Sequence, residues 1–280
     1  MDKKLAVEKK KKLVEDLKKL PSLMVAFSGG VDSTFLLAAA YEAIGNNVTA
    51  VTASSIVHSE KDRERAKRFT GESGIEHIIF ESNEIERSEF NTNPPDRCYH
   101  CKKLICEKIG RIALEKGVAH IAHAVNMDDL GDYRPGIKAA AEMGLMAPLI
   151  DAGLNKDEIR YLSKEMNLST WNKPAMACLA SRIPYGEKIT EEKIEMIARA
   201  ENILAEDGFN QYRVRHHGAV ARIEVGVDDI GRFMDKDFRD RYAALFKEIG
   251  FSHVALDLEG FVSGSLNRAL EESPENHNEP

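Results

Sequence analysis

The chain of 280 residues has little cysteine, a single tryptophan and no long apolar run. Four cysteines are too few for the disulfide framework of a small secreted protein. The longest apolar stretch, at 35–41, is far shorter than the roughly 20 residues that a membrane-spanning helix needs. The N-terminus is rich in lysine but lacks the apolar segment and cleavage site of a signal peptide. We therefore expect a cytoplasmic protein with no membrane partner.

The chain also lacks the positive excess that is typical of nucleic-acid-binding proteins. Its 39 basic and 46 acidic residues leave a formal net charge of -7, which disfavours broad capture of a polyanion. Hydrophobic residues at 43% and charged residues at 30% are ordinary values for a globular protein. The length predicts one larger domain with a small companion, and we expect no nucleic-acid partner.

Short apolar runs alternate with segments of helical period between residue 23 and about residue 168. Buried strands are predicted at 23–27, 48–53, 77–80 and 119–125. Helices are predicted at the lysine-rich N-terminus and at 31–45, 59–73, 99–117, 134–143 and 155–167. This alternation is typical of a parallel sheet covered by helices, in which ligands bind beyond the carboxyl ends of the strands. We predict an open α/β sandwich over residues 1–186.

The pattern changes after Trp171, where two prolines and little periodicity indicate an ordered functional loop at a domain boundary. A helix at 190–206, a hairpin around His217-Gly218, a helix at 238–249 and a further strand then predict a small α+β domain at 187–265. An acidic tail at 266–280 is expected to be disordered. Exposed strand edges in a small domain are often buried between subunits, so we expect a homo-oligomer.

The hexapeptide SGGVDS, at 28–33, follows the first predicted strand and opens a helix. Free backbone N–H groups and the positive end of the helix dipole at such a junction bind phosphate. Gly29 and Gly30 permit close approach of the backbone, Ser28 and Ser33 add hydroxyl donors, and Asp32 is suited to hold a metal or a ribose. The hexapeptide has neither the Walker spacing nor the G-x-G-x-x-G of dinucleotide folds. It resembles the PP-loop of the ATP pyrophosphatase superfamily, which implies an enzyme that cleaves ATP between its α and β phosphates.

A second polar cluster begins at Asn126, at the end of the predicted strand 119–125 and at the same sheet edge as the hexapeptide. Asp32 and Asp129 supply the one or two carboxylates that Mg²⁺ prefers beside phosphate oxygens, so we predict a magnesium site; a solvated turn is the alternative. The predicted ATP-binding residues are Ser28, Gly29, Gly30, Asp32, Ser33, Asn126 and Asp129.

Three of the four cysteines, Cys98, Cys101 and Cys106, lie within nine positions. Cys98 and Cys101 fall at a predicted helix start, where the helix dipole favours thiolates that bind a soft metal. One C-x-x-C pair is half of a zinc site, and the sequence has no second pair. Cys178, in the boundary loop, is the remaining partner, and three thiolates leave one iron of a 4Fe-4S cluster open to sulfide. Cys106 lies in an apolar helical run and is predicted to be in the core.

Several arginines are suited to bind a phosphate or a carboxylate in a bidentate manner. Arg134 lies in a loop, and Arg182 directly follows Ser181 near Cys178. On the predicted hairpin, Arg213 and Arg215 share one strand face, and Arg222 and Glu224 share a face of the partner strand. This row is either a cross-strand ion network or a lining for substrate. The predicted substrate-binding residues are Arg134, Ser181, Arg182, Arg213, Arg215 and Glu224.

Five segments together resemble the LarE family of PP-loop sulfurtransferases, and the resemblance runs from about residue 10 to 262. They are RCYHCK (97–102), NMDDLGDYRPG (126–136), DAGLNKDEIR (151–160), KPAMACLASRIPYG (173–186) and VRHHGAVARIEV (214–225). The resemblance implies adenylylation of a carboxylate of pyridinium-3,5-biscarboxylic acid mononucleotide. A sulfur nucleophile then displaces AMP, which leaves a thiocarboxylate for the nickel-pincer nucleotide cofactor of lactate racemase. The resemblance also adds Glu201 to the predicted substrate-binding residues, because Glu201 resembles an acid near the family's active site.

Two routes for the sulfur are open within this family. Members with a single cysteine, which matches Cys178, give up the sulfur of that cysteine. For members that also have cysteines matching Cys98 and Cys101, the resemblance implies a 4Fe-4S cluster that passes on added sulfide. This chain has all three, so we favour the cluster, with ATP and Mg²⁺ as further cofactors and sulfide or another sulfur donor as partner. The alternative functions are a PP-loop tRNA thiolase, which the net charge disfavours, and a non-catalytic ATP or redox sensor.

Overall fold

The structure is a computed structural model that describes residues 1–131, 135–174 and 177–271. The chain divides into two compact units, one made of Met1–Glu84 and Asp96–Met176 and the other of Ile85–Pro95 and Ala177–Pro280. This division differs from the predicted boundary at residue 186, because the segment that follows residue 176 packs against 85–95. The side-chain amide of Asn93 donates to the carbonyls of Ile183 and Pro184 at 3.2 and 2.6 Å.

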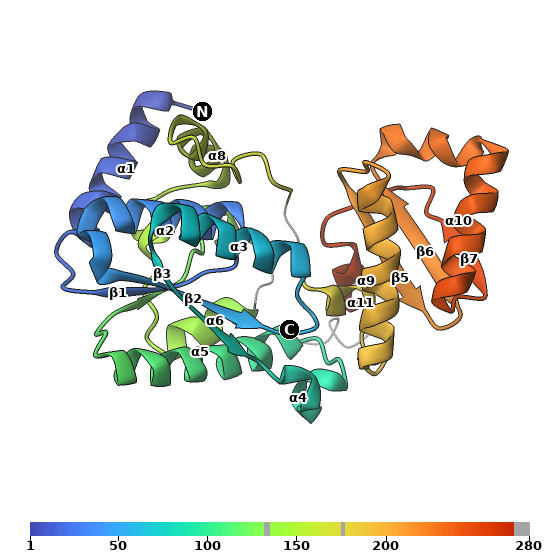
Figure 1. The fold of residues 1–280 in the computed structure, drawn as a ribbon, viewed down its shortest axis with the longest axis horizontal. Helices are drawn as coiled ribbons and strands as arrows, with labels where there is room; N and C mark the ends of the chain where they lie inside the picture. Colours follow the sequence, from blue (N-terminus) through green and yellow to red (C-terminus); the bar gives the residue numbers. More distant parts are fainter. Residues whose placement is uncertain (132–134, 175–176, 272–280) are drawn as a thin grey trace, which may run out of the picture. The chain divides into compact units, whose positions relative to one another are not determined.

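The first unit is built on a four-stranded parallel sheet of order β3-β2-β1-β4, which confirms the predicted open α/β sandwich. Its strands are β1 (Leu23–Ala26), β2 (Val48–Ser54), β3 (Glu76–Glu81) and β4 (Ile121–Ala122). Its helices are α1 (Lys3–Leu17), α2 (Val31–Ile44), α3 (Glu60–Ser73), α5 (Arg97–Lys116), α6 (Pro135–Glu142), α7 (Pro148–Asp151) and α8 (Lys156–Glu165). Helices α1, α2, α3 and α8 lie on one side of the sheet, and α5 and α6 lie on the other (Figure 1). Strand β4 is shorter than the predicted strand 119–125.

The central strand β1 has apolar side chains on both faces because both faces are covered. Leu23 and Val25 are buried with residues of α1 and α2, whereas Met24 is buried with Ile109 and Ala113 of α5. Successive side chains of a strand point to opposite faces, so a central parallel strand reads as a continuous apolar run. The packed sheet fixes the edge from which the loops after β1 and β4 project.

The second unit contains a three-stranded sheet of order β5-β6-β7, in which β5 and β6 form an antiparallel hairpin and β7 runs parallel to β6. Its strands are β5 (Tyr212–His217), β6 (Val220–Val225) and β7 (His253–Leu256), and its helices are α4 (Ser88–Asn91), α9 (Glu191–Glu206), α10 (Lys236–Ile249) and α11 (Arg268–Glu271). An aromatic core that includes Phe233, Tyr242 and Phe246 joins α10 to the sheet. The predicted small α+β fold is confirmed.

Part of the predicted acidic tail has regular structure, because the chain forms a 3-10 turn at Ser265–Asn267 and then α11. Residues 272–280 lie outside the described residues. In the ranges that the structure does describe, no helix combines the length and the apolar character needed to cross a membrane.

Candidate active site

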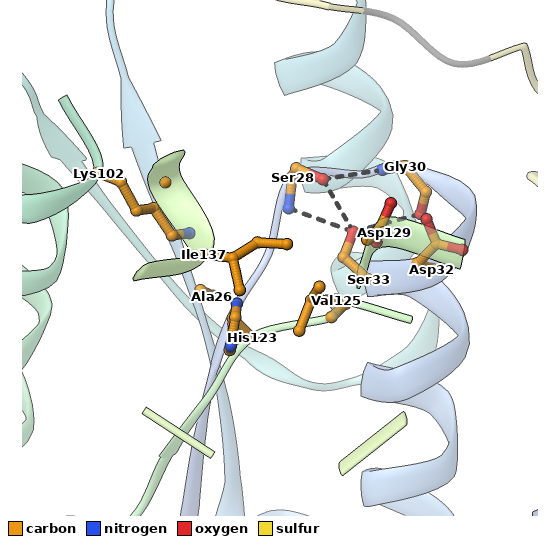
Figure 2. Close-up of a pocket in the computed structure, with 12 residues that line it drawn as sticks. Ala26, Ser28, Gly30, Asp32, Ser33, Lys102, His123, Val125, Asp129 and Ile137 are labelled. Carbon is orange, nitrogen blue, oxygen red and sulfur yellow. Dashed lines mark hydrogen bonds between the residues drawn. The ribbon is translucent and has the colours of Figure 1, made fainter. Parts of the chain in front are cut away.

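The turn between β1 and α2 carries the predicted phosphate-binding hexapeptide. Gly29 has a left-handed φ of 66°, and a Cβ at this position would lie 3.1 Å from the backbone oxygen of Asp62, so a side chain here would be both strained and tightly packed. The hydroxyls of Ser28 and Ser33 lie 3.0 Å apart, and the Ser33 hydroxyl also accepts the backbone N–H of Ser28 (Figure 2). Gly30 is the N-cap of α2 and has no side chain to occupy the first-turn N–H groups. The turn therefore presents backbone donors to an anion.

A cavity of about 260 Å³ opens beside this turn. Figure 2 shows residues that line it. Its lining includes five of the predicted ATP-binding residues, namely Ser28, Gly30, Asp32, Ser33 and Asp129. The two others have different contacts. The carbonyl of Gly29 accepts a hydrogen bond from Lys173, and the side-chain oxygen of Asn126 accepts the backbone N–H of Asp128. Asn126 is thus a buried turn residue rather than part of the cavity wall.

Asp32 and Asp129 line the same cavity. Oδ2 of Asp32 accepts a hydrogen bond from Nζ of Lys156 at 2.5 Å, while Oδ1 is buried and finds no hydrogen-bond partner among the described residues. Burial raises the pKa of Asp32; the charge of Lys156 opposes this effect and the charge of Asp129 adds to it. A buried carboxylate oxygen in need of a partner, beside a second carboxylate and an anion-binding turn, fits the preferences of Mg²⁺.

No group of three or more His, Cys, Asp or Glu side chains in the described parts of the chain is arranged to hold a metal ion. A Mg²⁺ ion on Asp32 and Asp129 would therefore take its remaining ligands from phosphate oxygens and water. This division of ligands is the usual one at nucleotide sites, where Mg²⁺ keeps several waters.

Lys102 and His123 also line the cavity, although neither was among the predicted site residues. Lys102 directly follows Cys101 on α5, so the motif RCYHCK already included this lysine and could have indicated it as a site residue. Burial lowers the pKa of His123 to about 4, and the charge of Lys102 acts in the same direction. His123 is therefore neutral at physiological pH and contributes a polar but uncharged wall.

Two more lysines contact residues of the hexapeptide. Lys156 opens α8 and pairs with Asp32, and Lys173 donates to the carbonyl of Gly29. Both lie in segments that resemble the LarE family, DAGLNKDEIR and KPAMAC. In sequence they look like ordinary solvent-exposed lysines, and only their partners, more than a hundred residues away, distinguish them.

All four cysteines lie in the described ranges, and none of them is in a disulfide. Cys98 is exposed and Cys101 is half-buried in the first two turns of α5, three positions apart and therefore on one helix face. Cys106 is buried beside Ala140 and Leu145, and burial raises the pKa of its thiol. The prediction that Cys106 belongs to the core is confirmed.

In the second unit, Cys178 is the N-cap of a 3-10 turn at Leu179–Arg182. Arg182 is 1% exposed, and its Nη1 donates to the carbonyls of Ala177 and Cys178 at 2.8 and 3.3 Å. Its Nε and Nη2 donate to the two carboxylate oxygens of Glu201 at 2.7 and 3.0 Å. Burial lowers the pKa of Arg182, but Glu201 outweighs this effect and the pKa is raised. Arg182 and Glu201 thus fix the backbone of the cysteine loop.

Arg215 forms a second buried bidentate pair, with Glu224 across the hairpin, at 2.8 Å for both contacts. Its Nη1 also donates to the carbonyl of Ser181 at 2.8 Å, and Arg222 shares Glu224 at 3.1 Å. The cross-strand ion network, one of the two predicted alternatives for this row, is present. Arg215 contacts the cysteine loop through Ser181 and is therefore also a positioning residue.

Arg213 is different, because its guanidinium lies over the ring of Phe261 at 4.7 Å. Burial lowers the pKa of Arg213 to about 10, and the charges of Arg182 and Arg215 act in the same direction. Glu224 and Glu201 oppose this lowering, and Arg213 still carries a charge at neutral pH. A guanidinium is suited to bind an anionic ligand. Arg134, the remaining predicted arginine, lies outside the described residues.

An open parallel sheet with SGGVDS at its first strand–helix turn defines the PP-loop class of ATP-using enzymes. The family model of NAD synthase matches residues 6–110, which contain the hexapeptide and strands β1 to β3. A component of the glutamine-hydrolysing GMP synthase of Archaeoglobus fulgidus is 25% identical over 221 residues, which are 74% of this chain and 72% of the relative.

Two relatives that are more than 35% identical cover almost the whole chain. The pyridinium-3,5-bisthiocarboxylic acid mononucleotide synthase of Lactiplantibacillus plantarum is 37% identical over 263 residues, 94% of this chain and 95% of the relative. An uncharacterized protein of Synechocystis is 41% identical over 251 residues, 90% of this chain and 94% of the relative. The chain belongs to the LarE family of PP-loop enzymes, as does the synthase.

Proposed function

We propose that this enzyme converts a carboxylate of pyridinium-3,5-biscarboxylic acid mononucleotide to a thiocarboxylate at the expense of ATP, for the nickel-pincer cofactor of lactate racemase. One observation carries the proposal. A phosphate-binding turn with paired carboxylates lies in a chain that is similar along 94% of its length to a synthase of the bisthiocarboxylic acid mononucleotide.

The first step is transfer of AMP to the substrate. A carboxylate oxygen of the substrate attacks the α-phosphorus of ATP, the bond to the bridging oxygen breaks, and pyrophosphate leaves. The N–H groups of the SGGVDS turn and the Ser28 and Ser33 hydroxyls would bind the departing phosphates. Asp32 and Asp129 would hold Mg²⁺, which neutralises phosphate charge. Lys102 and Lys156 add positive charge at the cavity.

The second step replaces the activated oxygen by sulfur. A sulfur nucleophile attacks the carbonyl carbon of the acyl adenylate, the bond from carbon to the AMP oxygen breaks, and AMP leaves with one oxygen of the original carboxylate. In the second unit, Arg182, Glu201, Arg215 and Glu224 hold the Cys178 loop, and Arg213 with Ser181 is assigned to the substrate's anionic groups. Arg134 is assigned to the same task from its sequence position alone.

The sulfur donor is proposed to depend on three cysteines. Cys98, Cys101 and Cys178 would hold a 4Fe-4S cluster, which supplies exchangeable sulfide. The chemistry of the donor set supports this, because none of the three cysteines is in a disulfide and two lie on one helix face.

The function is tested with the full chain, ATP, Mg²⁺, a sulfide source and the pyridinium substrate under anaerobic conditions. We expect AMP and pyrophosphate to form only with the substrate, and the product mass to show oxygen replaced by sulfur. Formation of pyrophosphate without any dependence on the substrate would contradict the proposal. So would submicromolar binding of tRNA at physiological salt, because it would favour a tRNA thiolase.

The sulfur route is tested by the iron and sulfide content after anaerobic reconstitution. We expect about four irons per chain, lost in Cys98→Ala and retained in the matched control Cys106→Ala. If iron does not load and Cys178 loses the mass of H₂S after one turnover, the sulfur comes from Cys178 itself.

A further inference from the structure

The peptide between Gly29 and Gly30 decides what the phosphate-binding turn presents to its ligand. The carbonyl and the N–H of a trans peptide point in opposite directions, and the described residues contain no cis peptide bond. The Gly30 N–H donates a hydrogen bond to the Ser28 hydroxyl, at 3.4 Å between the heavy atoms, and both residues line the cavity. The Gly29 carbonyl consequently points away from the Ser28 hydroxyl.

A peptide flanked by two glycines rotates with little steric penalty, so this orientation needs an explanation. A half-turn of the peptide would point the carbonyl oxygen into the cavity, where it would repel phosphate. Nζ of Lys173 donates to the Gly29 carbonyl at 3.0 Å and thereby opposes that rotation.

Lys173 is itself held in place by several contacts. Its side chain is 9% exposed, and Nζ also pairs with Asp62 of α3 at 2.7 Å. Burial lowers the pKa of Lys173, and Asp62 opposes that effect. Its backbone is fixed from α8, because Arg160 donates to the carbonyls of Trp171 and Lys173 at 2.9 and 2.7 Å. A charge held this firmly is a better anchor than a mobile surface lysine.

We infer that Lys173 is a positioning residue of the nucleotide site, which holds the Gly29 carbonyl outward and so keeps the Gly30 N–H on the cavity side of the turn, beside the Ser28 hydroxyl. The inference rests on the proposed use of ATP at this turn. It also gives the segment that leads toward Cys178 a direct bond to the phosphate-binding loop, within the first unit.

The test is the affinity of the full chain for two probes, ATP with Mg²⁺ and adenosine, measured by calorimetry. Adenosine lacks phosphate and is insensitive to the orientation of the 29–30 peptide. A charge-assisted hydrogen bond of this kind predicts that Lys173→Met weakens ATP binding on the order of 10- to 100-fold and leaves adenosine binding unchanged. Lys173→Arg, which keeps a charged donor, should recover most of the ATP affinity.

Lys164→Met is the matched control, because Lys164 contacts the same segment, over the Trp171 ring at 4.7 Å, and has no bond to the turn. It should bind ATP like the wild type. The inference is wrong if Lys173→Met binds ATP normally, or if ATP and adenosine weaken by the same factor, as general structural damage would require. Lys173→Gln replaces Lys173→Met under the same criteria if the latter does not fold. A wild-type chain that binds no ATP would instead remove the proposed function, and the inference with it.

Discussion

The buried pair of Arg182 and Glu201 makes a quantitative prediction about the cysteine loop. The two side chains are 1% and 6% exposed, and their two hydrogen bonds are in a bidentate arrangement. Glu201→Leu leaves a guanidinium buried without its counter-charge, which costs about 3–5 kcal/mol. The substitution also removes the acceptor of the Val214 backbone N–H, at 3.0 Å. This cost is a large part of the roughly 5–15 kcal/mol that stabilises a typical domain.

Arg182→Met should cost a similar amount because it leaves the carboxylate unpaired. The double variant, Arg182→Met with Glu201→Leu, contains no unpaired charge. Its loss of stability should therefore be well below the sum of the two single losses.

Hydrogen exchange with mass spectrometry measures this loss of stability in the peptides that cover the Cys178 loop and β5. Fluorescence of Trp171, which lies in the first unit, serves as an internal reference that should not change. Asp240→Leu is the control, because it breaks a pair with Lys236 in the same unit whose members are 63% and 77% exposed, and it should leave exchange unaltered. Additive losses in the double variant, or a loss below about 1 kcal/mol for Glu201→Leu, would refute the reasoning.

Three further predictions concern the first unit. The pKa of His123 is lowered from 6.5 to about 4, so as the pH falls the imidazole is protonated in the unfolded chain before it is protonated in the folded one. The free energy of unfolding should therefore fall by up to about 3 kcal/mol between pH 6.5 and pH 4. Urea unfolding at these two pH values checks this, and His123→Gln should reduce the loss. Burial raises the pKa of Asp32, so its ionised form weakens the fold at neutral pH; Asp32→Asn should raise the melting temperature and abolish pyrophosphate release. Cys106→Ala should cost on the order of 1 kcal/mol in urea unfolding and leave activity intact, whereas a loss of activity would contradict the core role of Cys106.

The elements of regular structure were largely predictable from the sequence. The central strand β1 is a continuous apolar run because helices cover both faces of its sheet. The hairpin at 212–225 shows an alternation of polar and apolar residues, although most of its side chains are buried. That residues 85–95 belong to the second unit was not predictable from the sequence. It depends on the contact of Asn93 with Ile183 and Pro184, some ninety positions later.

The sequence by itself determined the phosphate-binding turn, because everything that this turn needs is local: two glycines, two hydroxyls and the start of a helix in six consecutive positions. Only the tertiary structure decided which charged residues hold that turn and the cysteine loop. An arginine or a lysine has the same side-chain chemistry whether it lies at the surface, binds a ligand or forms a buried ion pair. Its partner in the folded chain decides which of these three roles it has. For Arg182, Arg215 and Lys173 the partners are Glu201, Glu224 and the Gly29 carbonyl, and folding alone brings them into contact.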